Sequence, residues 1–349
     1  MGKKQHYVPQ TLLRNWSQDG SSIHVYQLDL DKTIETAAID GQAQKPFYYG
    51  KDQKIENLLS QLEGEAATVI KKILQGERDL SPEDKRCLIH FVAMQNIRTP
   101  GRIQKIDDEI TELAKRMIYN AGKIKDIEVL NKLKVSVNNN SFWQIRMYLQ
   151  SFLLYADLRI AYLKSTDTNK FVIGQDPIVI TNKFLTERDW PLSKQGLAMK
   201  GLTVFLPLSS DLMLCLYDGK TYGFVGNKSK YQLNDEEIDN LNFYQFCNTE
   251  NSIYYLQHND NFKQMKEESD SYRTSSSAHA MESPIVDGKQ VITTGGNDYP
   301  KNPVQTFLGI KIMALRLPLT YETLQRPAAI GAIEYLKNDP KFSVVFAGE

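Results

Sequence analysis

The feature that most constrains the fold is a change in the spacing of apolar residues near residue 165. Before it, apolar residues recur every three or four positions, as in residues 55–74 and 81–99, which predicts amphipathic helices. After it, short apolar runs such as 204–206 and 212–217 are separated by turn residues, which is typical of strands. Helices and strands are therefore segregated, and we predict an α+β fold in which a helical block packs against a largely antiparallel sheet.

Local signals place the individual elements. Ser81 followed by Pro82 and two acidic residues predicts a capped helix start. The other helices that we expect are 102–119, 142–163 and one from 234 to about 247. The other strands that we expect are 23–28, 33–39, 171–173, 178–180, 222–225 and 253–255.

Composition along the chain suggests three parts. Residues 1–262 are predicted to form one α+β domain, with its helical part at about 52–165 and its strand-rich part at about 166–262. Residues 263–288 are polar and rich in serine, which is typical of a linker or loop. Residues 289–349 are predicted to be a small extension with a strand at 309–315 and a helix at 327–336.

Charge and motifs exclude several classes of protein. Lys plus Arg and Asp plus Glu both number 42, which disfavours binding of nucleic acid through bulk charge, although not through a local basic groove. The three cysteines lack CxxC spacing, which disfavours a structural zinc site. The chain has no phosphate loop and no GxGxxG, HExxH or GxSxG motif, so ATPases, dinucleotide oxidoreductases, zincins and α/β-hydrolases are disfavoured.

The sequence also bears on location. No apolar run approaches the length of a membrane span, and the first residues carry no apolar signal region. We therefore expect a cytoplasmic protein with no membrane partner.

Several sequence blocks resemble one known family. Residues 5–10 read Gln-His-Tyr-Val-Pro-Gln and residues 13–16 read Leu-Arg-Asn-Trp, which is similar to the start of the family called domain of unknown function 4238. That resemblance implies no activity. It implies a bacterial or phage origin, among mobile-element and defence genes. The later blocks that resemble the same family are 59–65, 95–100 and 171–177, with Pro-Leu-Ser at 207–209.

The opening block supplies the first candidate site residues. His6 has a side chain that titrates near neutral pH, so it is suited to act as an acid or a base. Gln10 lies one helical turn further on and is suited to bind substrate beside it. The alternative is that His6 and Tyr7 fix the N-terminus by hydrogen bonds while Val8 enters the core.

A second group of candidates lies at the end of the predicted helix 81–99. Gln95 and Arg98 share one helix face, and Arg102 follows the Thr-Pro break. An arginine presents a planar fork that suits phosphate or carboxylate, so these three residues are candidates for an anion clamp that binds substrate. The alternative is an ion pair between Arg98 and Glu63 or Glu65 of the preceding helix.

Asp176 is the third candidate. It lies in a turn between two apolar strands, where a carboxylate can act as a base or bind a divalent ion such as magnesium or manganese. The alternative is that Asp-Pro simply stabilises the turn.

Two functions are compatible with these residues. The first is a phosphate-directed enzyme, a nuclease or nucleotide-processing protein, with His6 and Asp176 as catalytic residues, the anion clamp on a nucleic acid or nucleotide, and a bacterial mobile-element or phage-defence context. The second is a non-catalytic binding or regulatory module for a protein or a small ligand, in which the same polar residues form a structural network. A structure separates the two by showing how these side chains are used.

Overall fold

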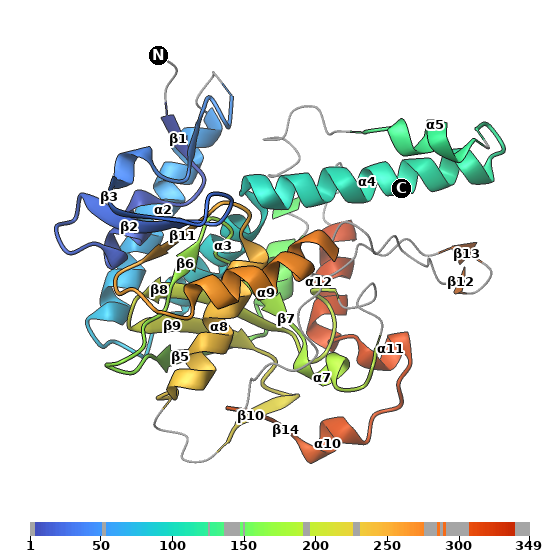
Figure 1. Cartoon of the computed structure of the whole chain (residues 1–349). Coiled ribbons are helices and arrows are strands. Elements are labelled where there is room, and N and C mark those ends of the chain that lie inside the picture. Colours follow the sequence, from blue (N-terminus) through green and yellow to red (C-terminus); the bar gives the residue numbers. More distant parts are fainter. Residues whose placement is uncertain are drawn as a thin grey trace.

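The architecture is α+β, as predicted from the spacing of apolar residues. Among its described residues the computed structural model has two four-stranded sheets, three two-stranded pairs, and helices that cover them (Figure 1). All pairings between named strands in these sheets are antiparallel. The residues described are 4–50, 54–124, 126–135, 147–148, 151–190, 196–225, 231–275, 285–286, 289–290 and 307–338.

The central sheet is buried on both faces. Its strands lie in the order β5 (Arg159–Lys164), β9 (Leu212–Tyr217), β8 (Thr203–Ser209) and β7 (Val179–Thr181). Along β9, Leu212, Leu214 and Leu216 enter one core, while the alternating Met213, Cys215 and Tyr217 enter a second core on the other face. This period of two is what a strand produces when both of its faces are covered.

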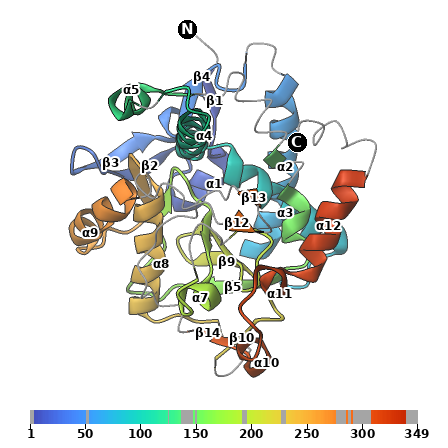
Figure 2. The same cartoon turned by 90° about the vertical axis from the view of Figure 1, so that its right-hand side faces the viewer.

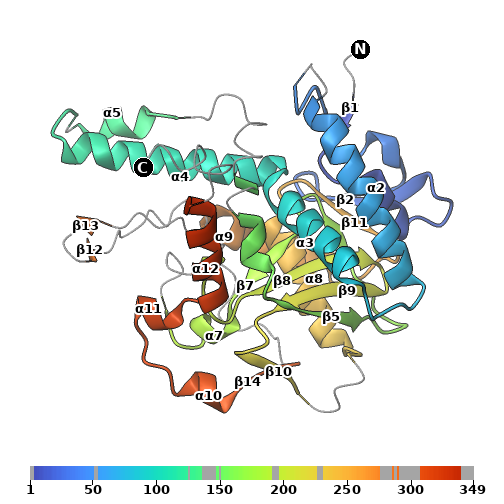
Figure 3. The ribbon, with the colours of Figure 1, turned by 180° about the vertical axis from the view of Figure 1, so that it is seen from behind.

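Helices cover the two faces of the central sheet. On one side lie α2 (Lys54–Leu74) and α3 (Pro82–Ile97), seen from behind in Figure 3. On the other lie α7 (Lys183–Thr186) and α8 (Asp235–Asn248). The predicted start of α3 is confirmed, because the Ser81 side chain accepts a hydrogen bond from the backbone N–H of Asp84 at 3.1 Å.

The second sheet has the order β3 (Lys32–Ala38), β2 (Ser22–Gln27), β11 (Ser252–Tyr255) and β6 (Ile173–Gly174). Helix α9 (Phe262–Ser275) packs on it through Phe262 and Met265, which join a third core with Tyr26, Phe246 and Tyr255.

The N-terminal residues form a compact layer beside α2. Strand β1 (Lys4–His6) pairs with β4 (Gln44–Pro46). Short helical turns follow at α1 (Gln10–Leu13), η1 (Arg14–Trp16) and η2 (Ile39–Gly41).

Helix α4 (Pro100–Asn120) extends outward from this body and carries α5 (Ile127–Lys132) alongside its outer end (Figures 1 and 3). In Figure 2, α4 is seen nearly end-on with α5 beside it. We call these two helices and their connection, residues 100–135, the arm. None of the described helices combines the length and the apolar character that a membrane crossing requires.

The C-terminal residues pack onto the strand-rich part of the chain. Strand β14 (Leu308–Ile310) pairs with β10 (Tyr222–Phe224), and Phe307, Leu308, Ala314 and Leu324 are buried in the second core. The remaining elements of this region are α10 (Ile312–Leu315), α11 (Tyr321–Leu324), α12 (Pro327–Asn338) and the pair β12 (Ile285–Val286) and β13 (Lys289–Gln290).

Three local predictions are wrong. The helix expected at 142–163 is contradicted at its end, where a 3-10 turn, η3 (Phe152–Tyr155), leads into strand β5; residues 136–146 lie outside the described residues. Residues 263–275, expected to begin a linker, form α9. The strand expected at 309–315 ends at Ile310, after which Ile312–Leu315 is helical.

Candidate functional site

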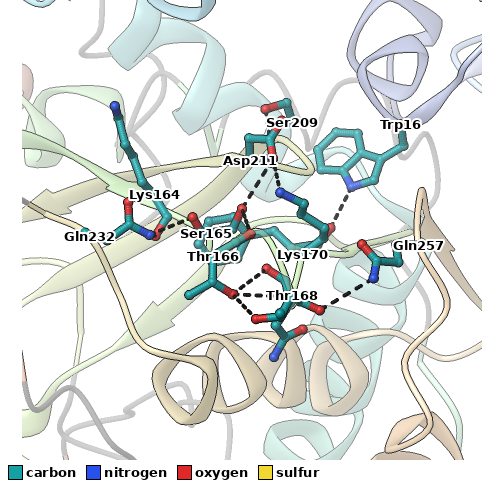
Figure 4. Close-up of polar contacts among 12 residues, drawn as sticks. Trp16, Lys164, Ser165, Thr166, Thr168, Lys170, Ser209, Asp211, Gln232 and Gln257 are labelled. Carbon is teal, nitrogen blue, oxygen red and sulfur yellow. Dashed lines mark hydrogen bonds and ion pairs between the residues drawn. The ribbon is translucent and has the colours of Figure 1, made fainter.

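Side chains of the opening block are bonded to main-chain groups of later blocks. The Asn15 amide donates to the carbonyl of Leu208 at 2.7 Å. The Trp16 indole donates to the carbonyl of Phe171 at 2.9 Å (Figure 4). The family-like blocks therefore meet in space, and they meet through hydrogen bonds that fix the positions of chain segments.

A second connection runs through the end of α3. Gln95 is fully buried and donates through Nε2 to the carbonyl of Tyr7 at 2.9 Å. Arg98 donates through Nε to the Gln95 side-chain oxygen at 2.8 Å and through Nη1 to Glu63 Oε1 at 2.6 Å. Block 59–65, block 95–100 and the opening block are thus joined by one buried network.

Arg98 is charged within this network. Its side chain is 2% exposed, whereas that of Glu63 is 24% exposed. Burial alone would lower the pKa of Arg98, but the charge and the hydrogen bond of Glu63 raise it above the ordinary value. The sequence analysis gave two alternatives for Arg98, an anion clamp or an ion pair with Glu63 or Glu65. The structure has the ion pair, and its partner is Glu63.

His6 lies at the edge of the same layer, half-buried at the end of β1. Arg14 Nη2 donates to Gln10 Oε1 at 2.9 Å, so the Gln10 amide turns its NH₂ group toward His6 Nε2, 3.1 Å away. His6 Nε2 also lies 3.2 Å from the Asp40 carbonyl oxygen, which can only accept, so the tautomer of the ring decides which of the two contacts is a hydrogen bond. Burial lowers the pKa of His6, with smaller opposing effects from the Asp40 carbonyl and the Glu63 charge, and this favours the neutral form of the ring.

A pH dependence of stability follows from His6. Its folded-state pKa lies below the unfolded value of about 6.5, so the unfolded chain binds more protons as the solution becomes acidic. The free energy of unfolding should be largest above that pH and fall as the pH drops through it. His90, whose pKa is also lowered by burial and by Arg86, adds to the effect.

Urea unfolding at pH 7.5 and pH 5.5 measures this dependence. We expect the difference in unfolding free energy to be smaller in His6→Gln and smallest in the His6→Gln/His90→Gln double variant. A double variant with the full wild-type difference would contradict the assignment of neutral rings.

Asp176 lies in a turn that helix α8 holds in place. The Asn248 amide donates to the Asp176 and Ile178 carbonyls at 2.6 and 2.9 Å, and the Gln245 amide donates to the Pro177 carbonyl at 3.1 Å. Asp176 is 8% exposed, and its carboxylate lies against the first turn of α4. A Cβ added to Gly101 would stand 2.4 Å from Asp176 Oδ2, so any larger residue there would force the Asp176 carboxylate to move.

The predicted site residues are therefore distributed over three neighbouring groups. His6 contacts Gln10 at the surface, Gln95 contacts Arg98 in the interior, and Asp176 lies against the start of α4. Arg102, half-buried in that first turn, is close enough to Tyr155 to oppose the rise in the pKa of the Tyr155 phenol that burial causes. Among the described residues, no three His, Cys, Asp or Glu side chains are grouped as a metal ion requires, so the prediction of a magnesium or manganese ion at Asp176 gains no ligand set from them.

Some of the residues in these contacts were missed at the sequence level. Gln245 and Asn248 are buried amides on α8, and Gln5 is a buried amide that accepts from the Tyr49 N–H at 2.6 Å and donates to the Gly50 carbonyl at 3.2 Å. The sequence feature that could have indicated these residues is an amide side chain at a position that packs toward the core, because a buried amide needs hydrogen-bond partners.

The fold and these contacts define an α+β protein in which separated polar blocks form one hydrogen-bonded frame. The chain belongs to the family described as Protein of unknown function (DUF4238), whose sequence model matches residues 4–259. Membership of that family, which the sequence blocks predicted, is thereby confirmed. No curated protein and no solved structure matches the chain.

Proposed function

We propose that the chain is a binding module, and that the polar residues of its family-like blocks form the frame of that module. The observation that supports this most is the use of Arg98, whose guanidinium is bonded to Gln95 and Glu63 inside the protein. A clamp for an external phosphate needs its guanidinium directed to the ligand. Arg98 is instead part of the connection between three segments.

The other polar residues of the blocks support the same proposal. Trp16, Asn15, Gln95 and Gln5 each donate to a main-chain carbonyl of a distant segment. Such bonds satisfy buried carbonyls and fix the relative positions of elements. A bacterial mobile-element or phage-defence context and a cytoplasmic location are part of this proposal.

A phosphate-directed enzyme is the second candidate, and one observation favours it. The Asp176 carboxylate lies against Gly101 in the first turn of α4, and Arg102 is the next residue. An acid and a guanidinium at a helix N-terminus are also the groups that bind a phosphate together with a divalent ion. In that case Asp176 would be the base or the ligand of the ion, and His6 the acid.

A turnover assay with matched variants distinguishes the two functions. Purified protein is incubated with magnesium or manganese and with DNA, RNA and nucleoside triphosphates, and the products are followed by gel electrophoresis and phosphorus NMR. We expect no turnover from the wild type, because the His6 side chain contacts Gln10 at the surface whereas the Asp176 carboxylate lies against Gly101, in a separate group.

If the wild type shows turnover, the His6 and Asp176 variants distinguish the enzyme from the binding module. Loss of turnover in both His6→Ala and Asp176→Asn, with unfolding curves like that of the wild type, would overturn the binding proposal. Turnover that survives in both variants would exclude the second candidate as formulated.

A further inference from the structure

The arm is a preformed helical hairpin. Helix α4 ends with Gly122 in the left-handed region at φ +66°, where the Gly122 N–H donates to Tyr119 O at 2.9 Å and the Lys123 N–H donates to Ile118 O at 3.1 Å. This is a common way for a helix to end at a glycine. The Asp126 carboxylate then accepts from the Glu128 N–H at 2.9 Å and so caps α5.

The side of the arm between its helices is already filled. Thr111 Oγ1 donates to the Val135 carbonyl and accepts from the Val135 N–H, both at 2.9 Å, and Leu130 is buried against α4. With 21 residues, α4 has a length of about 30 Å. The outer end of the arm therefore holds its shape at a distance from the body (Figure 1).

Positive charge is concentrated at that outer end. Residues 115–134 contain six basic and two acidic residues, in a chain whose overall net charge is zero. Lys123, Lys132 and Lys134 are exposed. The two acids, Asp126 and Glu128, are exposed as well, so the six basic residues leave residues 115–134 with a net formal charge of +4.

The chemistry of this end favours a phosphate backbone as its partner. A helix that lies in a membrane surface needs a continuous apolar face, but the inner side of α4 is covered by residues 130–135. Among the side chains of the arm that the structure describes, the large apolar ones that are exposed are Met117, Tyr119 and Val129, at 62%, 51% and 47%. Clustered lysines attract phosphates over a distance, and an exposed tyrosine can stack on a base or sugar.

We propose that the outer end of the arm is a docking surface for nucleic acid, with Lys123, Lys132 and Lys134 on phosphates and Tyr119 beside a base or sugar. This inference rests on the proposed function as a binding module, and it names the class of ligand.

Fluorescence anisotropy of the full chain tests it. The probes are labelled duplex DNA, single-stranded DNA and RNA, with phosphatidylserine vesicles followed by co-sedimentation. The arm variant is Lys123→Glu/Lys132→Glu/Lys134→Glu. The matched control, Lys71→Glu/Lys85→Glu/Lys263→Glu, makes the same change in net charge at exposed positions of the body.

We expect the wild type and the body variant to bind nucleic acid, and the arm variant to bind at least about tenfold more weakly. The slope of the logarithm of the association constant against the logarithm of salt concentration should be smaller in magnitude by about 2–3 in the arm variant. Tyr119→Ala should weaken binding to single strands more than binding to the duplex.

Three results would overturn the inference: binding to vesicles only, equal loss of binding in the arm and body variants, and no binding to any nucleic acid. A failure here is distinguishable from a failure of the proposed function, because the turnover assay uses only variants of the frame.

Discussion

Replacing Arg98 with alanine is expected to lower the free energy of unfolding by about 3–5 kcal/mol. The substitution leaves the Glu63 carboxylate and the Gln95 side-chain oxygen without the donor that they share, in a place largely closed to water. Breaking a buried ion pair by removing one partner is costly because the remaining charge stays desolvated. The opening block should loosen as well, since Gln95 donates to Tyr7.

Urea unfolding of matched variants measures this effect. Arg86→Ala removes an exposed ion pair with Glu83, whose side chains are 66% and 72% exposed, and should cost less than about 1 kcal/mol. The loss of unfolding free energy in Arg98→Lys should lie between the losses in Arg86→Ala and Arg98→Ala, because an ammonium group cannot donate to both partners in the geometry of the guanidinium fork. A loss in Arg98→Ala no larger than that in Arg86→Ala would show that the buried network contributes little.

The sequence predicted an element correctly where its pattern of apolar residues matches the way in which the element is buried. Helix α3 has a cap and an apolar face, and strands β8 and β9 are apolar runs bounded by turns. Strand β5 was missed because both of its faces are buried. Ile160 and Tyr162 join one core while Ala161 and Leu163 join the other, so the four residues between Arg159 and Lys164 are all apolar and no period of two is visible. Helix α9 was missed because its sequence is polar and, among its described side chains, Phe262 and Met265 are the ones that join a core.

The candidate site was predictable only in part. The Arg98–Glu63 pair could be stated as an alternative because adjacent helices are expected to pack together. The contacts of Trp16 with Phe171 and of Asn248 with Asp176 could not, because they depend on how two sheets and α8 assemble. A polar residue type shows that a buried amide or cation needs a partner, but the partner is determined by the tertiary fold.

Arg326 is the clearest case of a partner determined by the tertiary fold, and its replacement is the second large effect that we expect. It lies outside the matched residues 4–259, yet its side chain is 2% exposed and forms an ion pair with Asp157, 169 positions earlier. Its Nη2 atom also donates to the Leu154 and Leu197 carbonyls at 2.5 and 2.6 Å. One guanidinium thus satisfies three acceptors.

Arg326→Ala should therefore lower the free energy of unfolding by about 3–5 kcal/mol, while Arg316→Ala, at an exposed position of the same C-terminal region, should change it by less than about 0.5 kcal/mol. Urea unfolding measures the size of the loss, and hydrogen exchange shows its extent. Because Leu308 and Leu324 are part of the second core, which also contains β5, β8 and β9, we expect faster exchange in the central sheet as well as in residues 307–338.

Faster exchange confined to residues 307–338 would contradict that expectation. It would mean that the C-terminal region opens separately from the matched domain, so that Arg326 holds an accessory segment and the second core persists without it. Exchange that quickens together in β8, β9 and residues 307–338 would instead show one cooperative unit. In that case the second core needs Phe307, Leu308 and Leu324 to close it, and the folding unit extends beyond residue 259, where the family match ends.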